Sequence, residues 1–214
     1  IKVLLSADAI LCEDTRHTGL LIQELKKRYG EQFDSSPDWK QKLISYYDEI
    51  EEKRLPEIVE RLLSGEKLAL VSDAGTPLIS DPGFRLVREC IKRGIKVESI
   101  PGPSAAITAL TSSGLPADKF IFLGYPPEKQ SQRIKFFDNL THMNRFMCTY
   151  VFYSAPHKLI QTLEDMKKAI GDIEIVIARE LTKVHEEVWK GPISQAMNAY
   201  NSPKGEFVLL FRLP

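Results

Sequence analysis

Short apolar runs alternate with amphipathic helical patterns through the first hundred residues of this chain. The runs have the length of buried strands, and the segments between them repeat apolar residues with the period of a helix. We expect strands over 9–12, 42–47, 67–72 and 95–100, with helices over 18–29, 54–64 and 82–93. Strands joined by helices in this way predict a parallel sheet with helices on its faces.

Glycine and proline mark the expected helix ends. Gly65 and Gly94 follow two of the helical patterns and are expected to end those helices. Asp81 and Pro82 have the residue types of an N-cap and a first helical position. The buried face of the helix that follows is predicted to consist of Phe84, Val87, Cys90 and Ile91.

The stretch IPGPSAAITALTSSGLP (100–116) reads as a hinge followed by a helix of small residues. We therefore predict two α/β domains in tandem, over residues 1–102 and 103–214. In the second domain we expect strands near 120–123, 147–153, 174–180 and 206–212, and helices near 128–140, 156–170 and 192–199. The helix after Pro156 is predicted to pack through Leu159, Leu163, Met166 and Ile170.

Charge and cysteine content narrow the function classes. Lys plus Arg and Asp plus Glu each number 29, so the formal net charge is zero, which excludes a globally basic nucleic-acid coat but not a local basic face. No apolar run approaches the roughly 20 residues of a membrane span. Cys12, Cys90 and Cys148 have no metal-binding spacing with the histidines. We therefore expect a cytoplasmic protein without a metal site. Because the chain opens at Ile1 and almost at once enters what looks like the middle of a domain, we also expect that an N-terminal piece is missing.

The stretch LVSDAGTPLISDPG (70–83) holds more turn-forming residues than a plain loop needs. Glycines at the carboxyl end of a parallel strand let the backbone approach a ligand closely. The stretch has no phosphate-binding glycine pattern and no Lys or Arg, so its carboxyl, hydroxyl and carbonyl groups suit a neutral or positive ligand. A tight turn followed by a helix cap is an equally good interpretation of the composition alone.

Three more polar clusters follow expected strands: CEDTRHT (12–18), PGPSAA (101–106) and ARELTKVHEE (178–187). Each cluster alone is weak evidence for a binding site, since such a cluster is usually an exposed loop whose charges pair with one another. Four clusters at strand ends in two domains predict one ligand cleft between the domains.

These motifs, with FYSAPHKL (152–159) and KGEFVLL (204–210), closely resemble the RsmI type of ribosomal RNA small-subunit 2′-O-ribose methyltransferases, within the tetrapyrrole methylase superfamily. The resemblance covers nearly the whole chain. It implies two α/β domains with S-adenosyl-L-methionine in the cleft between them, a homodimer, and 2′-O-methylation of a cytidine ribose in 16S rRNA at the decoding centre of the small ribosomal subunit. It assigns cofactor contact to Gly75, Thr76, Pro77, Ile79, Ser104, Ala105, Tyr153, Ala178, Leu181, Lys204 and Gly205.

The chain also departs from the family pattern. The family's first strand and its Gly-x-Pro-x-Asp loop are absent, and so is a C-terminal helical segment that some members have. Relatives often have His-Asn-Glu after the second strand, where this chain has Glu49, Ile50 and Glu51. If the His-Asn pair of the relatives touches RNA, its replacement here by Glu49 and Ile50 leaves the exact target nucleotide undecided.

A methyl transfer to a ribose hydroxyl depends mostly on positioning, and a general base adds about 10²–10⁴-fold. The sequence does not choose among five candidate bases: Glu13, Asp14, Asp81, Lys183 and Glu186. A lysine would serve only with a depressed pKa.

For RNA contact we single out Arg16, Arg133 and Lys135; the last two lie in a basic segment (125–160) with interleaved aromatic residues. A solvated helix face over core aromatics explains that segment equally well. Two other functions stay open: a small-molecule methyltransferase of the corrin or porphyrin type, and a non-catalytic ribosome-binding relative.

Overall fold

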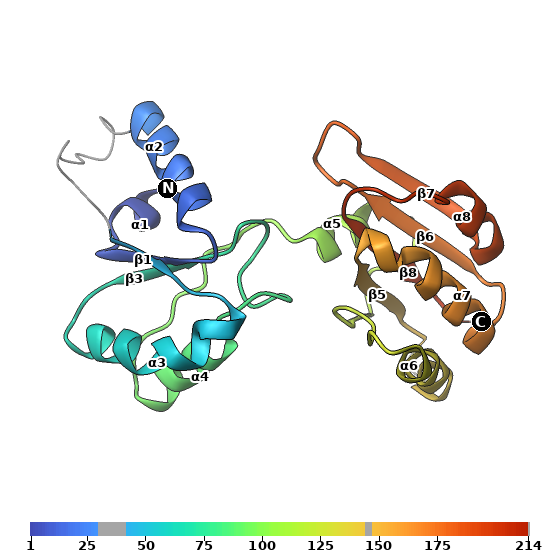
Figure 1. Ribbon diagram of the computed structural model, residues 1–214, viewed down its shortest axis with the longest axis horizontal. Coiled ribbons are helices and arrows are strands. Elements are labelled where there is room, and N and C mark those ends of the chain that lie inside the picture. The colour runs from blue at the N-terminus through green and yellow to red at the C-terminus, as the bar shows by residue number, and fades with distance from the viewer. Residues whose placement is uncertain (30–41, 144–146, 214) are drawn as a thin grey trace. The chain divides into compact units, whose positions relative to one another are not determined.

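The computed structural model describes residues 1–29, 42–143 and 147–213. The chain divides into two compact units, Ile1–Pro103 and Ser104–Pro214 (Figure 1). None of the described helices is both long and apolar enough to cross a bilayer.

A three-stranded parallel sheet forms the centre of the first unit, in the order β2-β1-β3. Its elements are α1 (Lys2–Leu5), β1 (Ala9–Cys12), α2 (Thr15–Tyr29), β2 (Lys42–Ser45), α3 (Asp48–Leu63), β3 (Leu68–Val71) and α4 (Phe84–Lys92). The predicted parallel sheet is therefore confirmed for this unit.

Helices cover both faces of this sheet (Figure 1). Ala9 and Leu11 of β1 pack with α3 and α4, while Ile10 and Cys12 pack with Ile22 of α2. All four residues of β1 are buried because neither face is open to water. This explains why the strand reads as a continuous apolar run.

Three local predictions for the first unit are wrong. Residues 95–100 form no strand. Helix α4 begins at Phe84 after Gly83, without a side-chain cap, so Asp81 is not its N-cap. Of the predicted buried face Cys90 is confirmed and packs beside Leu86, whereas Phe84 and Ile91 are 62% and 67% exposed. The expected ends at Gly65 and Gly94 are confirmed, since both residues adopt positive φ just after α3 and α4.

The second unit has a mixed five-stranded sheet in the order β4-β5-β8-β6-β7, in which β4 and β5 alone are parallel. Its elements are α5 (Ala105–Ser112), β4 (Phe120–Phe122), α6 (Gln130–Met143), β5 (Thr149–Ser154), η3 (Pro156–Lys158), α7 (Leu159–Ile170), β6 (Glu174–Arg179), β7 (Glu187–Pro192), α8 (Ile193–Ala199) and β8 (Phe207–Phe211). Strand β7 was not expected from the sequence.

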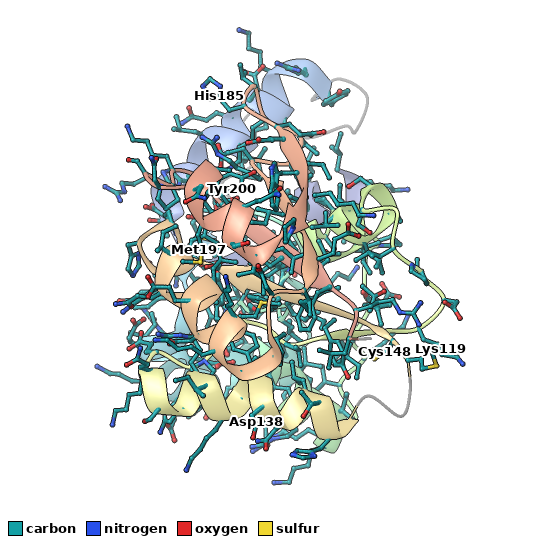
Figure 2. All side chains as sticks on the ribbon, turned by 90° about the vertical axis from the view of Figure 1, so that its right-hand side faces the viewer. Lys119, Asp138, Cys148, His185, Met197 and Tyr200 are labelled. Carbon is teal, nitrogen blue, oxygen red and sulfur yellow. The ribbon has the colours of Figure 1, made fainter. Side chains whose placement is uncertain are left out.

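Helices α6, α7 and α8 cover one face of this sheet, and α5 packs on the other. Figure 2 looks onto the three-helix face, with Asp138 on α6 and Met197 on α8. The predicted packing stripe of α7 is confirmed: Leu159, Leu163 and Met166 are fully buried, and Ile170 packs beside them.

Candidate functional site

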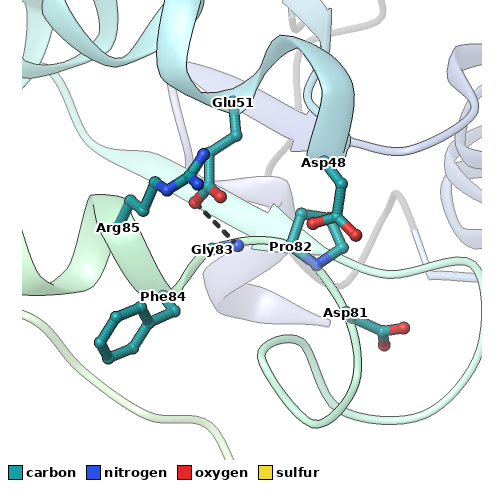
Figure 3. A pocket seen from close by; sticks show the side chains of 7 residues that line it. All are labelled: Asp48, Glu51, Asp81, Pro82, Gly83, Phe84 and Arg85. Atoms are coloured by element: carbon teal, nitrogen blue, oxygen red, sulfur yellow. Dashed lines mark hydrogen bonds between the residues drawn. The ribbon is translucent and has the colours of Figure 1, made fainter. Parts of the chain in front are cut away.

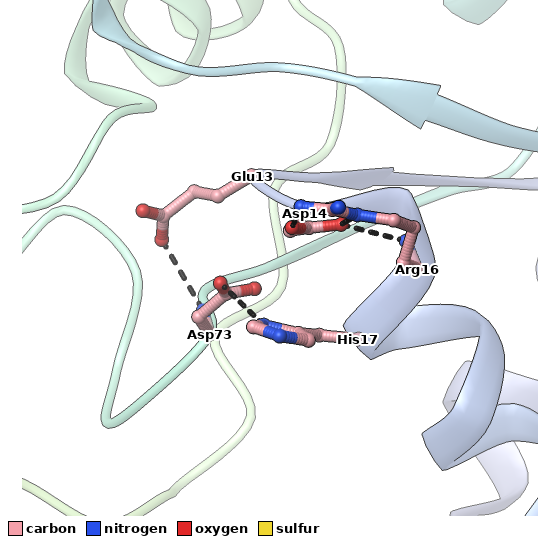
Figure 4. A network of polar contacts seen from close by, with 5 residues as sticks. All are labelled: Glu13, Asp14, Arg16, His17 and Asp73. Carbon is pink, nitrogen blue, oxygen red and sulfur yellow. Dashed lines mark hydrogen bonds and ion pairs between the residues drawn. The ribbon is translucent and has the colours of Figure 1, made fainter.

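Two of the predicted polar clusters meet at the carboxyl edge of the first sheet. Cys12 pairs with Val71 in the parallel register, so the segments that follow β1 and β3 leave the sheet side by side. The Glu13 carboxylate accepts a hydrogen bond from the backbone N–H of Asp73 at 3.2 Å, and Nδ1 of His17 lies 3.1 Å from Oδ2 of Asp73 (Figure 4). These contacts join residues about 60 positions apart.

Asp14 is held by Arg16 on the first turn of α2. The guanidinium donates to both carboxylate oxygens, at 3.1 and 2.6 Å, and the backbone N–H of Arg16 adds a third bond at 2.8 Å. These hydrogen bonds hold the pKa of Asp14 well below its usual range. A carboxylate so occupied is a poor proton acceptor, which argues against Asp14 as the base. The Arg16 side chain is 85% exposed.

The pKa of Asp81 is shifted in the opposite direction to that of Asp14. Burial, and then the nearby carboxylate of Glu13, raise the pKa of Asp81 to about 6, and Asp48 and Asp73 act in the same direction. A carboxyl group with this pKa is ionised at neutral pH yet is a better proton acceptor than an ordinary aspartate. Of the candidate bases, Asp81 therefore has a pKa shifted toward neutrality, which favours it as a general base.

A hollow of about 210 Å³ lies beside Asp81 and is lined by residues of α3, of the 70–83 loop and of the start of α4 (Figure 3). Glu51 borders it and is only 4% exposed. Its Oε1 accepts hydrogen bonds from the backbone N–H of Gly83 at 3.1 Å and from the Tyr46 hydroxyl at 3.2 Å. Glu51 thus fixes the end of the 70–83 loop to α3.

Sequence reasoning did not assign Glu51 to the site. A signal was present, because Glu51 stands four and seven residues before Leu55 and Ile58, which belong to the apolar stripe of α3. Helical periodicity therefore places this carboxylate on the buried face.

The turn at Gly75 and Thr76 is held against the segment that leaves the first unit. The Thr76 hydroxyl donates to the carbonyl oxygen of Pro103 at 2.7 Å. Gly75 adopts φ +79°, and a Cβ there would lie 3.8 Å from the same oxygen. Pro77 is half-buried and Ile79 is exposed. The 70–83 and 101–106 motifs, remote in sequence, are thus in contact through these residues.

Leu78 and Ser80, later in the same loop, adopt φ +73° and +66°. This region is unfavourable for side chains other than glycine and persists only where surrounding contacts enforce it. The hydrogen bond that the Gly83 backbone N–H donates to Glu51 supplies one such contact.

Several predicted cofactor residues of the second unit lie at one end of its sheet, where β5 and β6 end and β8 begins. Tyr153 and Ala178 both pair with Val208 of β8 from opposite sides, and Leu181 packs against the same apolar cluster. Ser104 and Ala105 begin α5, which contributes Ala106 to that cluster. Ala178 as a whole is fully buried, in a strand that is paired on both sides.

Lys183 lies in a network of ion pairs. Its ammonium is 3.0 Å from carboxylate oxygens of both Glu180 and Glu206, and these two partners raise the pKa of Lys183. A lysine held protonated is a poor proton acceptor, which argues against Lys183 as the general base. The network ties the 178–187 segment to the Lys204-Gly205 turn, whose Lys204 carbonyl accepts from Arg179 at 2.8 Å.

Arg133, predicted to contact RNA, is instead part of the interior of the second unit. Its side chain is 3% exposed and Asp165 of α7 is fully buried, with Nη2 2.6 Å from Oδ2. Its other hydrogen bonds reach the carbonyls of Pro127 and Glu128. Phe137 and Tyr150, two of the aromatic residues of the basic segment 125–160, are core residues, whereas Lys135 is exposed. Arg145 and Phe146 lie outside the described residues.

Comparison with known proteins decides the family. The model of the tetrapyrrole (corrin/porphyrin) methylases matches residues 1–197. The chain belongs to this family. The resemblance inferred from the sequence motifs is thereby confirmed.

Relatives within the family are similar over almost all of this chain. It is 42% identical to a ribosomal RNA small subunit methyltransferase I of Vibrio cholerae, over 98% of this chain and 69% of that protein. It is 40% identical to the protein of the same name from Thermotoga maritima, over 98% of this chain and 88% of the relative.

Solved structures of the tetrapyrrole methylase fold agree with the architecture. A diphthine synthase superposes with a TM-score of 0.67 at 14% identity, over 99% of this chain and 82% of that one. The cobalt-precorrin-4 methyltransferase of cobalamin biosynthesis gives a TM-score of 0.59 at 16% identity, over 98% and 85%. At these identities the likeness establishes the fold alone, which confirms the predicted α/β class.

Proposed function

We propose that this protein transfers a methyl group from S-adenosyl-L-methionine to the RNA of the small ribosomal subunit. The observation that carries the proposal is about 40% identity, over nearly the full chain, to proteins named ribosomal RNA small subunit methyltransferase I. Following the motif resemblance, we take the acceptor to be the 2′-hydroxyl of a cytidine ribose at the decoding centre of 16S rRNA.

The residues present suit this cofactor, which supplies a methyl group on a sulfonium cation. The loop from Ser72 to Gly83 contains no Lys or Arg, and it offers hydroxyl, carboxyl and carbonyl groups. Gly75, at positive φ, leaves the turn free of side-chain bulk beside the carbonyl oxygen of Pro103. We propose that this turn, with Thr76, Pro77 and Ile79, and the second-unit set of Ser104, Ala105, Tyr153, Ala178, Leu181, Lys204 and Gly205 take part in binding the cofactor.

We assign the general base to Asp81. The Asp81 carboxylate would accept the proton of the ribose hydroxyl and pass it to water, and the bound cofactor would supply the methyl group to the ribose oxygen. Glu51 positions this loop through Gly83. Glu13 raises the basicity of Asp81 without needing to touch the substrate. Arg16 and Lys135, both exposed, remain our candidates for phosphate contact.

A small-molecule methyltransferase of the corrin or porphyrin type, on the same fold, is the competing assignment. Incubating unmethylated small ribosomal subunits with labelled cofactor and mapping the product separates the two. We expect label in 16S rRNA on a cytidine 2′-oxygen. Label on another nucleotide would correct the target, and failure to label any subunit RNA, with cofactor bound, would overturn the proposal.

We further propose a homodimer that works in the cytoplasm. The three cysteines are free and buried, which agrees with a reducing compartment. Exposed apolar side chains on α2, Leu20 and Leu21, offer surface for a partner subunit. Sedimentation at micromolar concentration is expected to give twice the monomer mass of 24.3 kDa. A monomer across this range would refute the dimer.

A further inference from the structure

An aromatic ring stands in solvent beside the hollow that contains Asp81. Phe84 opens α4 and is 62% exposed, although the sequence pattern predicts it on the buried face. Arg85 follows it, and the guanidinium carbon of Arg88, one turn on, is 5.5 Å from the ring centroid. Exposed aromatic rings among cationic side chains are the usual stacking platforms for unpaired bases.

Arg85 is available for a phosphate. Its Nη1 is 3.9 Å from Oε2 of Glu52, and the two side chains are 48% and 86% exposed. An exposed pair at this distance contributes almost nothing to stability, so exchanging Glu52 for a phosphate costs little. The planar guanidinium also fits phosphate oxygens in pairs.

The hollow is lined by three carboxylates together with an aromatic and a cationic side chain. Asp48, Glu51 and Asp81 line it, with Phe84 and Arg85 at the end where α4 begins (Figure 3). Carboxylates accept hydrogen bonds from hydroxyl and amino groups but repel phosphate. A ligand that carries hydroxyl groups in one part and a phosphate in another matches this division.

The size of the hollow points to a part of a nucleotide rather than a whole ligand. Its volume of about 210 Å³ is below the range of about 300–1,000 Å³ that encloses drug-sized molecules. A ribose fits inside such a space while its base remains outside, against an exposed ring.

We infer that this hollow binds one unpaired nucleotide of the RNA substrate, with the base stacked on Phe84, the phosphate at Arg85 and the ribose hydroxyl directed toward Asp81. The inference rests on the proposed function and deepens it, since it places the acceptor nucleotide on the first unit.

A contact with another protein is the alternative use of this surface. Ile91 is 67% exposed and stands seven residues after Phe84, on the same face of α4. If the face were a protein interface, both side chains would contribute to it. If Phe84 is a stacking platform, Ile91 is irrelevant to RNA.

Four substitutions in the full chain test the inference. We expect Phe84→Ala to weaken binding of a single-stranded hexacytidylate RNA about 5- to 150-fold, the range for losing one stacked base. Phe84→Trp should retain affinity, and RNA should quench the fluorescence of the introduced indole. Arg85→Ala should lower the log–log salt slope of binding by about 0.7, the value for one single-strand phosphate contact. Ile91→Ala is the matched control, with wild-type RNA affinity.

The affinity for S-adenosylhomocysteine should stay at the wild-type value in all four variants, which separates RNA contact from cofactor contact. Unchanged RNA affinity in Phe84→Ala overturns the inference. Equal loss in Phe84→Ala and Ile91→Ala, with a shift of both toward monomer in sedimentation, assigns the face to a protein interface instead. Failure of the wild type to methylate small subunits would refute the proposed function, whereas the hexacytidylate titrations would still decide the nucleotide site.

Discussion

Replacing Arg133 by Met should unfold the second unit far more easily without touching RNA binding. The Arg133 and Asp165 side chains are 3% and 0% exposed, so removal of the guanidinium leaves a buried carboxylate whose remaining ion-pair partner, Lys168, is 3.9 Å away. Gln130 would still donate to Asp165 at 3.0 Å, but the carbonyls of Pro127 and Glu128 would lose their donor. Breaking a buried pair in this way costs about 3–5 kcal/mol. That is a large part of the roughly 5–15 kcal/mol that stabilises a typical domain.

The assay is urea unfolding at pH 7, followed by the fluorescence of Trp189, which packs against the core cluster that includes Phe137 of α6. A Trp39→Phe background removes the other tryptophan. Lys135→Met, exposed on the same helix, is the control and should change the free energy of unfolding by no more than about 0.5 kcal/mol. A cost below about 1 kcal/mol for Arg133→Met, or a loss of RNA affinity at unchanged stability, would refute a structural role.

Three further outcomes follow from the site. Gly75→Val should abolish calorimetric binding of S-adenosylhomocysteine while the protein stays folded, whereas Gly65→Val, at another positive φ with no atom within 4 Å of its Cβ, should bind normally; normal binding by the Gly75 variant would mean the cofactor site is elsewhere. Because burial and Glu13 raise the pKa of Asp81 to about 6, its carboxylate is protonated below that pH and cannot accept the hydroxyl proton. The value of kcat should therefore fall about tenfold per pH unit below 6 and level off above it. Asp81→Asn should lower kcat by about 10²–10⁴-fold and remove this fall of kcat at acidic pH. If the fall is retained in Asp81→Asn, it belongs to the titration of another group. Lys183→Met should keep the wild-type shape of the pH–rate profile, since its partners hold the ammonium protonated; a profile that loses a limb would restore Lys183 as a base.

Local pattern was enough to predict the first sheet but not the contacts that decide side-chain roles. The apolar run at 9–12 could be recognised because β1 is buried on both faces. Arg133 was misassigned because its partner, Asp165, is 32 residues away, and nothing in the local sequence shows that an arginine is neutralised. Phe84 was misassigned because helical periodicity gives the apolar stripe but not which of its members reach the core.

The errors at strands have a similar origin. Residues 95–100 alternate like a strand, yet no neighbouring strand pairs with them in the structure. Strand β7, which contains Gly191 and Pro192 and is mostly exposed, forms because β6 offers it an edge. Strand formation depends on partners, and partners are set by the topology rather than by the residues of the strand itself.

The position of β8 between β5 and β6 has a consequence for synthesis on the ribosome. The first sheet has all its described strands once residue 71 has been made, so that unit can begin to fold while translation continues. The second sheet lacks its middle strand until residues 207–211 emerge from the exit tunnel. Until then β4–β5 and β6–β7 are separate strand pairs with unpaired inner edges, which makes this the stage at which a nascent chain is most exposed to aggregation and most dependent on chaperones.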